Sequence, residues 1–89
     1  MFEKGQIVYS KNGRDKGRAF IVVDFDNEYL FLVDGQLRKL EKPKKKKIKH
    51  VQSCKKVEES IKYKIENNLY LNDADVRKAL AAYMLSETV

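Results

Sequence analysis

The stretch from Gly5 to Gly35 constrains the fold more than any other part of this chain. A short apolar segment at 7–9 leads into a basic loop that contains Gly13 and Gly17, and a second apolar segment follows that loop. Glycine adopts backbone angles that other residues avoid, so two glycines in one short loop predict a tight turn. The pattern therefore predicts a strand, a stiff cationic loop and a second strand, as at the end of a small β-barrel.

Further strands follow from the apolar pattern. Residues 19–25 are apolar on both sides of a strand, so we expect both of its faces to be covered. A turn leads into an apolar run at 29–33, and the Asp34-Gly35 pair predicts a two-residue hairpin into a strand at 36–40. A fifth strand is expected at 48–52, with a bulge or an early end. Five short, bent strands predict a small SH3-like barrel.

The periodicity changes near the C-terminus. The apolar residues there have the spacing of one helix face: Val76, Ala79, Leu80, Tyr83 and Met84. Asn72 or Asp73 can cap this helix, and with Asn72 as the cap Asp75 would complete a capping box. A preceding helix is predicted at 57–68 because Val57, Ile61 and Ile65 recur every four residues. The expected fold is mainly β with α, a single domain made of a barrel at 1–54 and a helical extension at 55–89 packed on the barrel's outer apolar face.

The charge is concentrated in one part of the chain. The 89 residues carry a formal net charge of +6, and the segment 38–56 contains ten Lys or Arg residues against a single acidic residue. A domain of this size has a limited core and little room for an enclosed catalytic cleft. A strongly basic segment favours polyanionic partners, with nucleic acid first among them.

The sequence gives little support for catalysis or metal binding. The single cysteine, Cys54, excludes an intramolecular disulfide, and with only one histidine a zinc site is not expected. No set of nucleophile, base and acid and no phosphate-binding glycine loop with its lysine is present. We therefore expect no enzymatic activity, no cofactor and no small-molecule substrate. The N-terminal residues lack the apolar core of a secretion signal, and no apolar run could span a membrane, so a soluble, cytoplasmic protein is expected.

Two basic segments form the candidate binding site. Lysine and arginine neutralise phosphates, and cations on a stiff loop suit that role. The candidate RNA-binding residues are Lys11, Asn12, Gly13, Arg14, Lys16, Gly17 and Arg18 in the loop, and Arg38, Lys39, Lys42, Lys44, Lys45, Lys46, Lys47, Lys49 and His50 in the second segment. The cations at 14, 16, 18 and 44–47 are expected to be exposed, so that replacing them leaves the fold intact.

Each of these features also has a structural interpretation. Lysine runs are usually solvated, and such a run can equally be a nuclear import signal. Asp15 is expected to cap loop N–H groups or to fix a neighbouring arginine. Tyr9 and Tyr29 could stack on bases, although packing is the favoured role for strand aromatics. His50 more often fits a surface or packing role than a functional one.

The order of glycine, apolar pair, basic loop with two glycines, arginine and apolar strand resembles the KOW motif of ribosomal proteins and transcription elongation factors. Together with the VDG turn at 33–35, the basic segment RKLEKPKKKKIKHVQ and the helical tail, it resembles the L-fourteen-e type of ribosomal protein and short bacterial KOW-domain relatives. The resemblance implies RNA contact through residues 11–18 and through the basic stretch that ends at Lys49-His50. It also implies that these two segments meet in space.

The function expected from these observations is binding of structured RNA, foremost large-subunit ribosomal RNA, as a ribosomal or ribosome-associated factor. The alternative is a protein-interaction module of the translation or transcription machinery, docking ribosomal or transcription proteins through its apolar helix face. Binding to double-stranded DNA is disfavoured, because the final predicted helix carries only Arg77 and Lys78 as basic residues.

Overall fold

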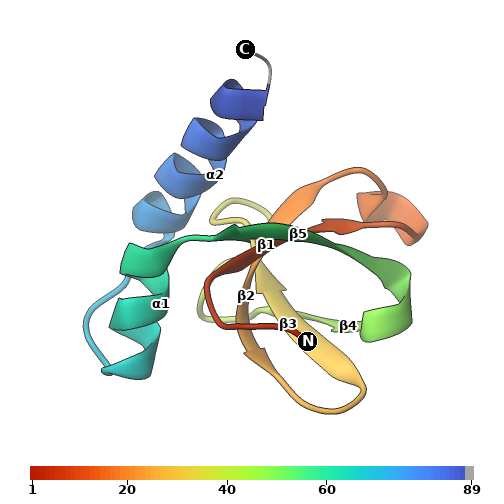
Figure 1. Ribbon diagram of the computed structural model, residues 1–89, viewed down its shortest axis with the longest axis horizontal. Helices are drawn as coiled ribbons and strands as arrows, with labels where there is room; N and C mark the ends of the chain where they lie inside the picture. The colour runs from red at the N-terminus through yellow and green to blue at the C-terminus, as the bar shows by residue number, and fades with distance from the viewer. Residues whose placement is uncertain (88–89) are drawn as a thin grey trace.

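Five antiparallel strands precede two helices in the computed structural model, which describes residues 1–87 (Figure 1). The strands are β1 (Gln6–Ser10), β2 (Ala19–Phe25), β3 (Tyr29–Val33), β4 (Lys44–Lys47) and β5 (Val51–Val57), and the helices are α1 (Glu59–Glu66) and α2 (Asp73–Glu87). Two short 3-10 turns, η1 (Gly13–Asp15) and η2 (Ile48–His50), interrupt the loops. The last two residues of the predicted 55–89 extension lie outside the described residues.

The strands form one sheet in the order β4-β3-β2-β1-β5, with every neighbouring pair antiparallel. Within residues 1–87 no hydrogen-bonded ladder joins β4 to β5, so the sheet is open. The protein is therefore a small mixed α/β protein in which helices follow a five-stranded antiparallel sheet. The register shifts once in the β1–β5 pair and once in the β2–β3 pair. Such irregularities bend a sheet.

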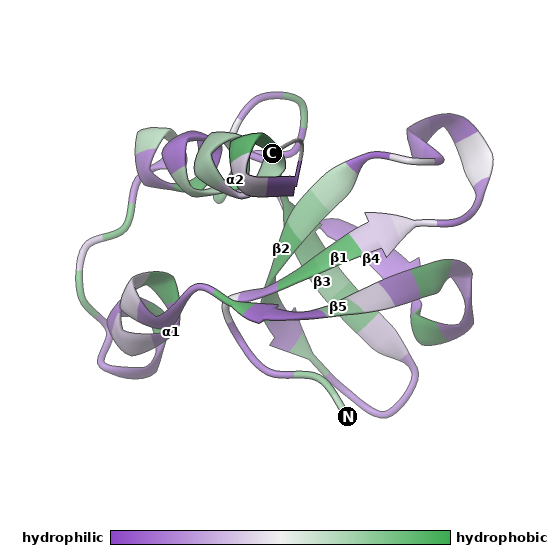
Figure 2. Ribbon diagram, turned by 45° about the horizontal axis from the view of Figure 1, so that its top comes forward, coloured by the Kyte–Doolittle hydropathy of each residue, from purple (hydrophilic) through white to green (hydrophobic). Residues whose placement is uncertain are grey.

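Apolar side chains fill both faces of the sheet, as the two-sided pattern of 19–25 predicted. On one face Ile7 lies opposite Ile21, and Ile21 lies opposite Val33. The helices cover this face with Ile61, Val76 and Leu80, all buried in the same cluster (Figure 2). The prediction that the helical pair docks on the sheet is thus confirmed.

On the other face of the sheet, side chains from strands that are not neighbours pack against one another. Its cluster contains Val8, Phe20 and Val22 from the central strands, and it also joins Leu30 of β3 to Val51 of β5. Because β3 and β5 are separated by two strands in the sheet, these residues share a core only if the sheet bends strongly. Figure 1 shows this bend: β5 lies across the view, whereas β3 runs diagonally upward from the β2–β3 turn.

The predicted capping box of the final helix is present. The Asp75 backbone N–H donates to Asn72 Oδ1 (2.8 Å), and the Asn72 N–H donates to Asp75 Oδ2 (3.2 Å). Val76 and Leu80 are buried, whereas Met84 is 42% exposed, so the buried stripe ends before Met84. The first helix lies within the predicted range of 57–68, but Val57 belongs to β5.

The predicted strand at 36–40 is wrong. The Asp34 carboxylate Oδ1 accepts the N–H groups of Gln36 and Arg38, both at 2.9 Å, and closes a compact loop there. The loop is then held against α2, since the Leu40 N–H donates to Asp73 Oδ1 (2.8 Å). Asp34-Gly35 forms a turn, but its side-chain hydrogen bonds replace the ladder that a hairpin would need.

The fourth strand instead consists of four consecutive lysines, β4, paired with β3. The predicted strand at 48–52 is wrong in its first half, because 48–50 form η2, and β5 then continues to Val57. The expected boundary between residues 54 and 55 falls inside β5.

Candidate nucleic-acid interface

The loop between β1 and β2 is a closed turn that displays cations. The Ser10 N–H donates to the Arg18 carbonyl (3.1 Å), and the Gly17 N–H donates to the Ser10 carbonyl (2.8 Å). Gly13 and Gly17 have φ of +75° and +85°, the left-handed conformations that their presence predicted. The geometry directs Lys11, Arg14 and Lys16 into solvent, and all three are exposed.

Asp15 connects this loop to the second basic segment. Its side chain is buried, and Oδ2 lies 3.2 Å from Lys44 Nζ and 3.8 Å from an Arg38 guanidinium nitrogen. A structural role for Asp15 was predicted, and the cations it holds come from the second basic segment. A buried carboxylate that faces two cations fixes the position of both segments.

Lys46 makes a second link. Its Nζ donates to the Asn12 carbonyl (2.8 Å), and only 8% of the residue is exposed. Burial lowers the pKa of the Lys46 ammonium and the nearby Lys44 charge lowers it further, while Asp15 opposes them. The expectation that Lys46 is exposed is wrong: alternation along β4 places Lys44 and Lys46 on the same face, toward the 11–18 loop, and Lys46 is buried there.

A main-chain contact joins the same two segments at their far end. The Lys11 N–H donates to the His50 carbonyl (2.9 Å). The expected meeting of residues 11–18 with the second basic segment is therefore confirmed by contacts through Asp15, Lys46 and His50. Lys39 and Lys42 are exposed in the loop before β4, and within residues 1–87 no hydrogen bond or ion pair joins either of them to the 11–18 loop.

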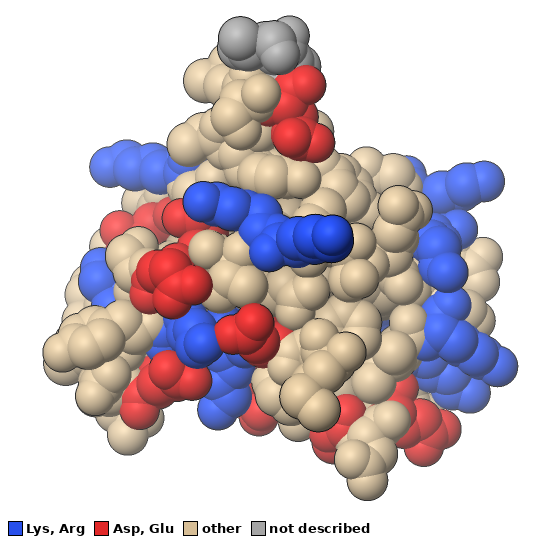
Figure 3. All heavy atoms as spheres, in the orientation of Figure 1, with Lys and Arg blue, Asp and Glu red and all other residues tan. Residues whose placement is uncertain are grey.

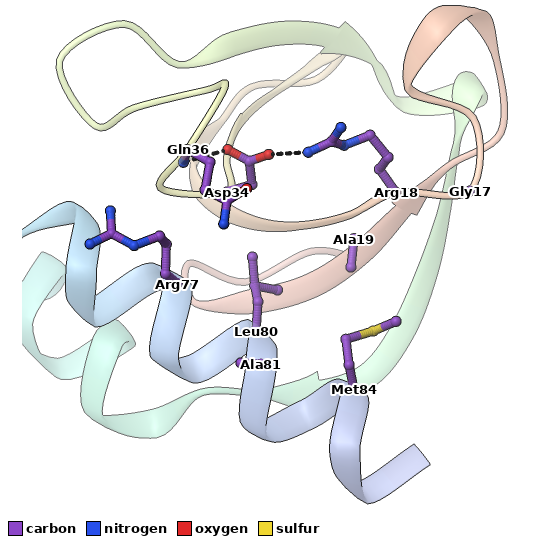
Figure 4. A pocket seen from close by; sticks show the side chains of 9 residues that line it. All are labelled: Gly17, Arg18, Ala19, Asp34, Gln36, Arg77, Leu80, Ala81 and Met84. Carbon is purple, nitrogen blue, oxygen red and sulfur yellow. Dashed lines mark hydrogen bonds and ion pairs between the residues drawn. The ribbon is translucent and has the colours of Figure 1, made fainter. Parts of the chain in front are cut away.

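Arg18 was expected to be exposed, but it is only partly so, and its charge already has a partner. Its guanidinium donates to Asp34 Oδ2 (3.0 Å), and 41% of its side chain is exposed. Figure 4 shows Arg18 and Arg77 on either side of the Asp34 loop, above the α2 side chains Leu80 and Met84. These residues line a hollow of about 290 Å³. Arg77 donates to the Gly35 carbonyl (2.8 Å), so both arginines hold the 34–38 loop.

The remaining candidate residues lie around the contacts between the two basic segments. Lys45 places its Nζ 4.3 Å from the centre of the Tyr29 ring, so the ring already has a cationic partner. In the described part of the chain, several candidate cations have no acidic partner: Lys11, Arg14, Lys16, Lys39, Lys42, Lys47 and Lys49. Figure 3 shows Lys and Arg gathered at the right edge, over the β1–β2 loop and the β4–β5 turn, whereas charges of both signs mix on the left.

Replacing Asp15 should loosen the link between the segments. Asp15→Asn removes the negative charge that Lys44 and Arg38 share, and leaves these cations facing each other. We expect a loss of about 1 kcal/mol in the free energy of unfolding, because both cations are partly solvated. Urea denaturation measures it. As a control, Asp24→Asn removes an exposed carboxylate of β2 and should change stability by less; an equal loss would contradict the role of Asp15.

A metal site of His, Cys, Asp or Glu ligands and a membrane-spanning helix each have requirements that the described residues do not meet. Among residues 1–87, no three His, Cys, Asp or Glu side chains are grouped so that they could hold a metal ion. Neither helix in that range is long and apolar enough to cross a membrane. No protein-family model matches the chain, and no curated protein matches it significantly.

Proposed function

We propose that this protein binds structured RNA through the phosphate backbone, as a ribosomal or ribosome-associated factor. The observation that carries the proposal is the link between the two basic segments. Asp15 and Lys46 are buried between them, while Lys11, Arg14, Lys16, Lys47 and Lys49 surround that link and have no acidic partner within residues 1–87. A preorganised cationic surface loses less conformational entropy when it binds phosphates than separate flexible lysines do.

The strand order and the bent sheet support a finer description of the fold. Leu30 of β3 and Val51 of β5 share a core, and η2 connects β4 to β5 over a very short distance in the chain. Both features suit an SH3-like barrel of the KOW type in which no hydrogen bonds of the described residues join the two end strands, β4 and β5. The resemblance of the 5–25 segment to a KOW motif supports the choice of RNA, and the L-fourteen-e resemblance supports the large ribosomal subunit.

Two observations make the alternatives weaker. The apolar face of α2, which a protein-interaction module would use, is packed against the sheet through Val76 and Leu80. Readout of duplex DNA usually employs a helix or a β-ribbon in the major groove, and α2 offers only Arg77 and Lys78, of which Arg77 is bonded to Gly35.

Salt dependence of binding tests the proposal. A triple variant, Lys11→Gln with Arg14→Gln and Lys16→Gln, should bind a ribosomal RNA stem-loop on the order of 30-fold more weakly at about 0.1 M salt. The negative slope of log affinity against log salt should become shallower by about 2 to 3. These side chains are exposed and make no ion pair in residues 1–87, so the stability should be unchanged.

A matched variant removes the same charge outside the proposed surface, at three cations that also make no ion pair in residues 1–87: Lys4→Gln, Lys55→Gln and Lys78→Gln. If both triple variants lose the same affinity, binding follows net charge and the proposed surface is wrong. Ultraviolet cross-linking of the tagged protein in cells, with sequencing of the attached RNA, then tests the ribosomal assignment. Reads concentrated on one region of large-subunit ribosomal RNA support it, and scattered reads contradict it.

A further inference from the structure

A second hollow, of about 460 Å³, opens beside the 11–18 loop. Its lining combines one aromatic ring, two lysines, a glutamine and small loop residues: Tyr9, Ser10, Lys11, Lys16, Gly17 and Gln52. The volume lies in the lower part of the ~300–1,000 Å³ range of small-ligand sites, and the lining is partly apolar, as such sites usually are. It adjoins the exposed cations of the proposed interface, because Lys11 and Lys16 belong to both.

The sheet and the final helix hold Tyr9 in place. In the sheet Tyr9 lies opposite Ala19 on one side and Gln52 on the other. By strand alternation its side chain is on the same face as Ile7, the face that the helices cover. Its hydroxyl donates to Met84 Sδ (3.6 Å) near the end of α2, and the residue is half-buried. The ring is therefore supported at its far end while it lines the hollow.

We propose that this hollow binds an unpaired base of the RNA, which stacks against the Tyr9 ring while Lys11 and Lys16 contact the flanking phosphates. Every base has a π-face, so stacking on an aromatic side chain accepts any base. Recognition of RNA loops and bulges commonly combines such stacking with phosphate contacts. The Gln52 amide, which can both donate and accept, lies in the same lining and can bond a base edge. The inference rests on the RNA-binding function proposed above.

The other tyrosines are placed differently. The ring of Tyr29 already has the Lys45 ammonium over it. The Tyr83 hydroxyl donates to Cys54 Sγ (3.3 Å), and its ring packs on the core cluster beneath the helices. Tyr63 and Tyr70 are 61% and 80% exposed, but they lie in α1 and the α1–α2 loop. Tyr9 combines an aromatic surface with neighbouring cations that have no acidic partner among the described residues.

Two substitutions of Tyr9 separate stacking from charge. Tyr9→Leu removes the ring, whereas Tyr9→Phe keeps the ring and loses only the contacts of the hydroxyl with Met84 and Tyr83. For a hairpin RNA with an unpaired loop, we expect Tyr9→Leu to bind on the order of 10-fold more weakly and Tyr9→Phe to bind within about twofold of the wild type. For a blunt RNA duplex, which exposes no unpaired base, both variants should bind like the wild type. Tyr70→Leu, a distant exposed tyrosine, is the control.

Fluorescence gives a second test that does not depend on affinity. The chain contains no tryptophan, so Tyr9→Trp creates a single reporter in the hollow. We expect the emission to be quenched when single-stranded oligouridylate binds and to change little with the duplex, because only an unpaired base can stack on the indole. Tyr70→Trp should respond to neither RNA.

The outcomes separate this inference from the proposed function. If the wild type shows no salt-dependent RNA binding, the proposed function itself is wrong. If the wild type binds but Tyr9→Leu loses no affinity for the hairpin, or loses the same factor for the duplex, the stacking site is wrong and the phosphate-binding surface stands. Circular dichroism of Tyr9→Leu shows whether a loss on both RNAs reflects unfolding, in which case the Tyr9→Trp quenching result decides.

Discussion

Gly35→Ala is expected to destabilise the fold by about 3 kcal/mol or more. Gly35 has φ of +78°, where an alanine is strained by roughly 1–2 kcal/mol. An added Cβ would also collide with the Asp73 carbonyl and would lie 2.8 Å from Arg77 Cγ, in a place where α2 meets the 34–38 loop. Overpacking of this kind costs about 1–3 kcal/mol more. For a domain whose total stability is about 5–15 kcal/mol, this is a large fraction.

Gly17→Ala is the matched control. Gly17 has a similar φ, +85°, but no atom lies within 4 Å of an added Cβ. Only the backbone strain of roughly 1–2 kcal/mol should remain. Urea denaturation followed by circular dichroism measures both variants. A loss at Gly35 no greater than that at Gly17 would show that α2 does not pack against this turn as described.

Asp34→Ala should cost about 3 kcal/mol in the free energy of unfolding. The buried carboxylate accepts two backbone N–H groups, from Gln36 and Arg38, and pairs with Arg18 at 3.0 Å. Hydrogen bonds to a charged group contribute about 1.5–3 kcal/mol each, and the cost of burying the charge offsets part of their sum. Asp34→Asn keeps an oxygen for the backbone groups but loses the charge, so it should cost less than Asp34→Ala.

The effect of Asp34 should depend on pH. Burial acts to raise the pKa of Asp34, but the N–H groups of Arg38 and Gln36 and the Arg18 charge outweigh it, so the pKa lies below its ordinary value of 3.8. The unfolded state therefore takes up the proton first, and the stabilisation by the carboxylate is complete above about pH 4. It is lost as the pH falls through the lower, folded pKa. The stability difference between the wild type and Asp34→Asn should be constant near pH 7 and shrink below pH 4; a difference that grows there would contradict this sign.

Local patterns predicted the elements whose signals lie within a few residues. The apolar runs at 19–25 and 29–33 predicted β2 and β3, and the helical spacing of apolar residues predicted both helices. The capping box could be read directly from Asn72 and Asp75 because its hydrogen bonds span three residues. Apolar residues on both faces of β2 also predicted the two cores, since each face needs a cover.

The elements that the sequence did not predict depend on contacts between residues that are far apart in the chain. In β4 all four side chains are lysines, so no alternation marks which of them points inward. Pairing with β3 sets Lys46 opposite Leu30, and the carbonyl of Asn12, more than thirty residues away, receives its ammonium. The turn at Asp34-Gly35 likewise depends on Arg77 and Asp73 of α2. No pattern in residues 34–40 contains that information.

At the candidate site, too, local patterns predicted some features and long-range contacts determine the others. Clusters of Lys and Arg identified both basic segments, but the sequence could not tell which cations are structural. Arg18, Lys44 and Lys46 are held by Asp34, Asp15 and Asn12. Tyr9 was placed among strand aromatics with a packing role favoured, and only the register with Gln52 puts its ring in the lining of a hollow beside the cationic loop.

The position of β4 at the end of the open sheet has a consequence for self-association. A terminal strand presents backbone N–H and C=O groups that a strand of another molecule could pair with, and charged side chains, lysine above all, discourage such pairing. Four consecutive lysines at this position would face the same run in a second copy, and like charges directly opposite one another destabilise a strand pair. This repulsion weakens as salt or a bound polyanion neutralises the lysines. The residues proposed to attract a polyanion thus also oppose the pairing of β4 with β4 of a second copy of this chain.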